Sequence, residues 1–69
     1  MTRATHGSES ARVGTIREAA RRAADEAYTE AWLALDAIPS LTSEDCGRAA
    51  ALVARSVYCR LCADAGVTP

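Results

Sequence analysis

The residues with the clearest chemical potential are two cysteines in a C-x-x-C motif, Cys59 and Cys62. Cysteines at this spacing bind zinc or carry out dithiol redox reactions. Structural zinc needs four ligands, and the further candidates are Cys46, about 20 Å away along the same predicted helix, and His6. The motif also falls near the C-terminal end of that helix, where the helix dipole disfavours a thiolate. We therefore interpret Cys59 and Cys62 as small buried side chains, with a metal-binding or thiol-redox module as an alternative function.

Other catalytic arrangements are not suggested by the sequence. His6 is the one histidine, lysine is absent, and no glycine-rich phosphate loop or pairing of nucleophile and base occurs. The carboxylates are explained as helix caps and solvated faces. We expect no enzymatic activity and no cofactor.

The composition limits what one chain can bury. Hydrophobic residues make up 49% of the 69 residues, but 16 of them are alanine, and Tyr28, Trp32 and Tyr58 are the only aromatics. A buried alanine methyl contributes about 0.8 kcal/mol, against about 1.5–3 kcal/mol for a buried Leu, Ile or Val. The sequence therefore predicts one small domain that a single chain cannot complete.

Apolar residues recur at three- and four-residue steps, which predicts an all-α fold of two helices. Ser10 is a candidate N-cap for the first helix, and Pro39 ends it. Thr42 and Asp45 form a capping-box pattern for the second helix, and Gly66 stops it. The short connection predicts an antiparallel hairpin. We expect a tail at 1–9, a hairpin over 10–66 (a helix at 10–37, a turn at 38–42 and a helix at 43–65) and a tail at 67–69.

The predicted contact between the helices uses small residues, from Ala20 to Ala34 on the first helix and from Gly47 to Ala54 on the second. Nearer the chain ends, Ile16 and Ala20 are expected to meet Val57, Leu61 and Ala65. Most of the large apolar side chains are expected at the margin of this contact or outside it. Trp32 and Leu33 are expected well outside it. We interpret these large side chains as an interface with another chain: Tyr28, Trp32, Leu33, Leu35, Leu52, Val53, Val57 and Leu61.

The charges give this association a direction. The first 24 residues contain five arginines and two glutamates, whereas residues 25–45 contain six acidic residues and no arginine. Two hairpins packed head to tail would bring opposite charges together. The residues expected to steer this packing are Arg17, Arg21, Arg22, Asp25, Glu26 and Glu30. We predict a homodimer that forms an antiparallel four-helix bundle, with a heterologous protein partner as the alternative.

Composition also bears on other partners and on location. The net charge of −1 argues against general nucleic-acid binding, although a contact through the Arg12–Arg22 cluster in an oligomer is a third alternative. The apolar runs are too short for a membrane span, and the first ten residues lack the apolar stretch of a signal peptide.

Three cysteines cannot all pair, so we expect a reduced cytoplasmic setting. Arginine without lysine, together with abundant alanine, suggests an actinobacterial or phage genome. We expect a small regulator or adaptor that acts through protein–protein interaction.

Overall fold

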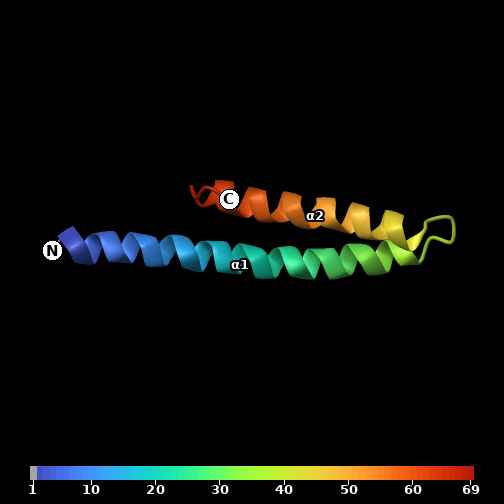
Figure 1. The fold of residues 1–69 in the computed structure, drawn as a ribbon, viewed down its shortest axis with the longest axis horizontal. Coiled ribbons are helices and arrows are strands. Elements are labelled where there is room, and N and C mark those ends of the chain that lie inside the picture. The colour runs from blue at the N-terminus through green and yellow to red at the C-terminus, as the bar shows by residue number, and fades with distance from the viewer. Residues whose placement is uncertain (1) are drawn as a thin grey trace.

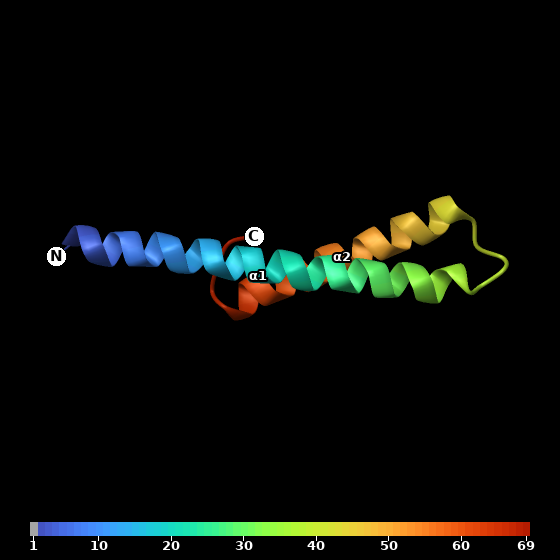
Figure 2. The ribbon, with the colours of Figure 1, turned by 90° about the horizontal axis from the view of Figure 1, so that it is seen from below.

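The computed structural model describes the backbone of residues 2–69 and the side chains of residues 10–69. Its two helices, α1 (Thr2–Asp36) and α2 (Ser43–Asp64), run antiparallel and pack against each other (Figure 1), which confirms the predicted all-α hairpin. Because α1 has 35 residues and α2 has 22, the N-terminal part of α1 extends past the end of α2 (Figures 1 and 2). The molecule is a rod of 59 × 15 × 14 Å.

The first helix begins earlier than the sequence indicated. Its first residue is Thr2, so α1 includes most of the stretch that we had assigned to a tail at 1–9. Between Thr2 and Asp36 there is no proline, and each glycine costs a helix only about 1 kcal/mol, which weakens the helix without ending it. Ser10 is consequently a helical residue and not an N-cap.

The turn between the helices matches the sequence signals. α1 ends at Asp36, one residue before the predicted end. The backbone N–H of Asp45 donates to Oγ1 of Thr42 at 3.1 Å, and the N–H of Thr42 donates to Oδ2 of Asp45 at 3.4 Å. This reciprocal pair satisfies backbone donors at the start of α2 that have no partner within the helix. The predicted capping box is therefore confirmed.

The end of α2 is closed by Gly66, which has a φ of 72°. Its N–H donates to the carbonyl of Ala63 at 3.0 Å, and the N–H of Val67 donates to the carbonyl of Cys62 at 2.8 Å. These two bonds form a Schellman motif, in which the last free carbonyls of the helix find donors. The left-handed conformation explains why glycine occupies this position.

The last residues pack back onto α1. Val67 is buried in a cluster with Ala20 and Cys62. Nε of Arg17 donates to the carbonyl oxygen of Thr68 at 3.0 Å. The segment that we had assigned to a C-terminal tail therefore contributes to the contact between the two helices.

The helices meet along rows of every fourth residue, which we call the seam rows. The α1 row is Ala20, Ala24, Tyr28 and Trp32, with Tyr28 39% exposed at its margin. The α2 row is Cys46, Ala50, Ala54, Tyr58 and Cys62. Cys46 and Cys62, which are 1% and 0% exposed, are the largest fully buried side chains in the described part of the chain. Four residues turn a helix about 40° past one full turn, so each row winds around its helix. Rows of this kind pack with the helices crossed, as Figure 2 shows.

The four-residue spacing corrects the predicted contact. Ala34 on α1 and Ala51 on α2 are exposed, although both were assigned to the inner face. Cys62, rather than Leu61, is packed with Ala20. Ala27 and Ala31, which were also assigned to the inner face, are half-buried, so the prediction was wrong in part only.

Two glycine substitutions test these helix assignments, because the same change is expected to act in opposite directions. Gly14→Ala should stabilise the protein by about 0.5–1 kcal/mol, since alanine favours helix. A Cβ atom at Gly14 would meet nothing within 4 Å. Gly66→Ala should destabilise it by about 1–2 kcal/mol, because the left-handed backbone strains an L residue. Thermal unfolding followed by circular dichroism measures both, and shifts in the same direction would contradict the assignments.

Candidate interaction site

Trp32 lies against Gly47 of α2. A Cβ atom added to Gly47 would come within 3.1 Å of Cζ3 of the indole, so the absence of a side chain there makes room for the ring. The ring of Tyr28 stacks on the indole, with centroids 6.4 Å apart and planes 20° from parallel. Our expectation that Trp32 falls outside the contact between the helices was therefore wrong. The four-residue row from Ala20 through Ala24 and Tyr28 leads to Trp32, and this spacing was the missed signal.

The other predicted interface residues are distributed around the molecule. Leu35 and Val57 are half-buried beside the seam. Leu33 and Leu52 are 64% and 65% exposed, and helical geometry directs both away from the seam on opposite outer sides of the hairpin. Tyr28, Val53 and Leu61 are exposed to a smaller degree. No single surface collects the whole predicted set.

One edge of the seam is aliphatic except at Asp45, the exposed capping-box residue that precedes Cys46. The other residues immediately before the seam positions are Ala19, Ala23, Ala27 and Ala31 on α1, and Ala49, Val53, Val57 and Leu61 on α2. One residue back is a rotation of about 100°, and in an antiparallel pair this rotation moves both rows to the same side. Val53 and Leu61 are 43% and 39% exposed. We call these eight residues the apolar edge.

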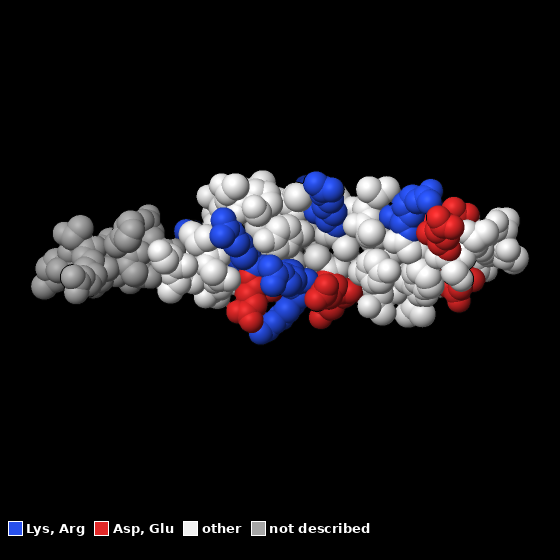
Figure 3. Space-filling model, in the orientation of Figure 1, with Lys and Arg blue, Asp and Glu red and all other residues white. Residues whose placement is uncertain are grey.

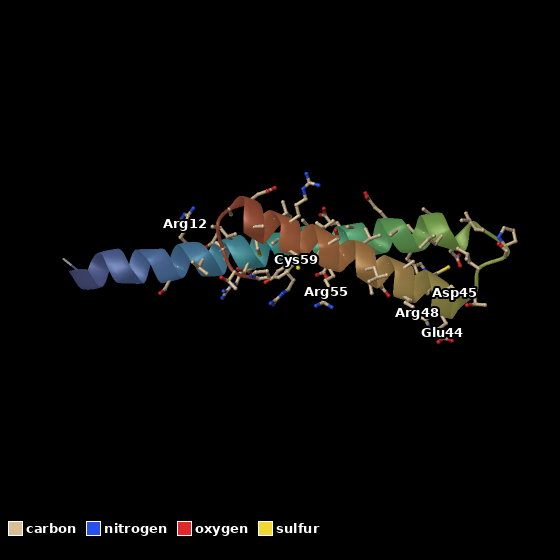
Figure 4. All side chains as sticks on the ribbon, turned by 90° about the horizontal axis from the view of Figure 1, so that it is seen from above. Arg12, Glu44, Asp45, Arg48, Arg55 and Cys59 are labelled. Atoms are coloured by element: carbon tan, nitrogen blue, oxygen red, sulfur yellow. The ribbon has the colours of Figure 1, made fainter. Side chains whose placement is uncertain are left out.

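The opposite edge of the seam carries charge. The residues immediately after the seam positions include Arg21 and Asp25 on α1 and Arg55 on α2, all of them exposed. The exposed Leu33, which follows Trp32, lies at the end of the same α1 row. Figure 4 shows Arg55 projecting from the same side of α2 as Glu44 and Arg48, and Figure 3 shows charged side chains over both helices on this side. We call this side the charged edge. The difference between the apolar edge and the charged edge was not predicted from the sequence, because it depends on which positions form the seam.

The six residues expected to steer association are all exposed. Arg22 pairs with Glu18 at 3.4 Å, and Arg48 pairs with Glu44 at 3.1 Å, both one helical turn apart. Such exposed pairs contribute only about 0.3–0.5 kcal/mol each. Arg17 is engaged by the carbonyl of Thr68, and the other four steering residues have no ion pair within the described part of the chain.

A depression of about 380 Å³ on α1 is lined by Asp25, Glu26, Thr29 and Glu30, and a second one of about 240 Å³ by Tyr28, Thr29, Trp32 and Leu33. Both lie along a single helix, so they are shallow surface features. The carboxylates in the first depression are solvated, and their chemistry is that of a polar helix face.

The burial of each cysteine depends on its position relative to the seam and not on membership of the C-x-x-C motif. Cys62 is buried, as interpreted from the sequence, and Cys46 is buried as well, whereas Cys59 is partly exposed. Among the side chains that the structure describes, no three His, Cys, Asp or Glu residues are grouped so that they could hold a metal ion. The side chain of His6, the proposed additional ligand, lies outside the described residues.

Neither helix, over the residues described, combines the length and apolar character that a membrane crossing requires. Comparisons of the chain with protein-family models, with curated proteins and with solved structures found no match.

A double-mutant cycle tests the contact between Trp32 and Gly47. Trp32→Ala should cost about 1–3 kcal/mol, less than a fully buried tryptophan, because the ring is half-buried. In that background Gly47→Ala should stabilise by about 1 kcal/mol through helix propensity. In the wild type the same change should give no such gain, because the new methyl group presses on the indole. Equal effects of Gly47→Ala in both backgrounds, measured by denaturant unfolding, would contradict the contact.

Proposed function

We propose that this chain is a non-enzymatic protein that acts through protein–protein interaction, and that it associates with a second copy of itself as a four-helix bundle. The supporting observation is the size of its buried side chains. Within the described residues the core consists of Ala20, Ala24, Cys46, Ala50, Cys62 and Val67. Larger apolar side chains on one face of the hairpin, among them Val53 and Leu61, stay partly in water.

The energetic reason is that small side chains give little on burial. Each buried methyl group of the alanines contributes about 0.8 kcal/mol, whereas ordering one residue costs about 1.5 kcal/mol. Two helices in contact along one seam leave most of each helix surface in solvent. A helix with apolar residues on more than one side is stabilised when a further helix covers them.

The shape of the chain supports the same conclusion. Its radius of gyration is 16.2 Å, whereas about 11 Å is expected for a compact chain of this length. It exposes 5285 Å² of accessible surface, against about 4200 Å² for a compact monomer of 7.3 kDa. Packing a second hairpin alongside would bring both quantities toward those of a globular protein.

The biological role that we propose is that of a small regulator or adaptor. The two helices offer extended surface for contact with another protein. Exposed charges of opposite sign at the two ends of α1 favour an ordered encounter over general adhesion. A heterologous partner could use the same surfaces once the homodimer dissociates or in place of it.

The mass of the particle in solution tests this proposal. Light scattering on purified protein should give twice the chain mass of 7.3 kDa at micromolar concentration. Circular dichroism on the same samples reports whether the helices are formed. A monomeric mass with undiminished helicity would contradict the proposal, because the hairpin would then be complete by itself.

A further inference from the structure

We propose that the second copy docks on the apolar edge and runs antiparallel to the first, with the two-fold axis passing near Ala23 and Val57. This inference rests on the proposed self-association and adds the surface, the direction and the register. The dimer contact would be α1 against α1 and α2 against α2, each pair antiparallel. Two observations carry it: the position of the aliphatic residues and the order of the charges along α1.

The apolar edge has the size and composition of a helix-packing surface. Its row on α1 consists of alanines, which permit close approach of a second helix. Its row on α2 consists of Ala49, Val53, Val57 and Leu61, which are partly exposed and supply the larger groups. The charged edge cannot offer an equivalent surface, because burying Arg21, Asp25 or Arg55 would carry a desolvation cost. Leu33 and Leu52 lie off the apolar edge and stay outside this contact.

The charges on α1 fit an antiparallel copy better than a parallel one. The described part of α1 has a basic half and an acidic half: residues 12–22 contain four arginines and Glu18, and residues 25–36 contain four acidic residues and no arginine. The boundary between the two halves falls at Ala23 and Ala24. The halves act through their overall charge, because Arg21 and Asp25 lie on the charged edge and outside the proposed contact. A two-fold axis at this level places the basic half of each α1 beside the acidic half of the other. A parallel copy would instead set like charges side by side.

The same axis also matches the aliphatic residues. Since Trp32 faces Gly47 and Ala20 packs with Cys62, residue 23 lies level with residues 57 and 58 of α2. An axis at Ala23 therefore passes close to Val57. Val57 then meets Val57 of the other copy, Val53 meets Leu61, and Ala19 meets Ala27, so the larger side chains pair with one another across the contact.

Disulfide cross-linking tests the register, because in an antiparallel dimer only a residue near the axis meets its own counterpart. Val57→Cys is made in a Cys59→Ser background, where the remaining cysteines, Cys46 and Cys62, are buried. Under mild oxidation most of this variant should form a disulfide-linked dimer. Leu52→Cys in the same background is the matched control. It is on the same helix and more exposed, yet it should stay unlinked, because it faces away from the apolar edge.

A mixture of Val53→Cys and Leu61→Cys chains, in the same background, should also cross-link, whereas Ala49→Cys alone should not. The light-scattering mass of the wild type distinguishes a failure of this register from a failure of the proposed self-association. A dimeric mass without a Val57→Cys disulfide would overturn the antiparallel register and leave self-association intact. In that case cross-linking between Ala23→Cys and Val57→Cys chains would identify a parallel arrangement. A monomeric mass would overturn both.

Discussion

The close approach of α1 and α2 through small side chains is the constraint on which the rest of the structure depends. Alanine and cysteine at every fourth position let the two helices cross in contact, and Gly47 makes room for the indole of Trp32. This arrangement leaves little space between the helices for larger apolar groups. Val67 is buried there and Ile16 packs against it, whereas Leu33, Leu52, Val53 and Leu61 remain exposed. The small side chains that let the two helices pack closely therefore also leave larger apolar side chains exposed to solvent.

The elements of the fold were largely predictable from local signals. Thr42 with Asp45 marked the start of α2, Gly66 marked its end, and a short connection around Pro39 implied the hairpin. The beginning of α1 was not predictable in this way. Glycines and polar residues weaken a helix without ending it, so the composition of residues 2–9 did not define a boundary.

The candidate site was less predictable because it depends on how the two helices cross. Shifting the contact by one residue rotates a helix by about 100° and exchanges the aliphatic edge for the charged one. From the sequence, Ala51 and Leu61 were assigned to the inner face and Trp32 was left outside. The observed rows pass through Cys62 and Trp32 instead, whereas Gly47 faces the other helix as predicted. The four-residue spacing was present in the sequence, but only the packed pair distinguishes it from a mixture of three- and four-residue steps.

We propose that a single hairpin buries too little apolar surface to be stable alone. The thermal midpoint of the helical signal, measured by circular dichroism over a wide range of protein concentrations, tests this directly. Folding coupled to association obeys mass action, so we predict a midpoint that falls continuously as the protein is diluted. A midpoint that is independent of concentration down to the lowest measurable signal would contradict the account, because it would mean that one chain folds without a second.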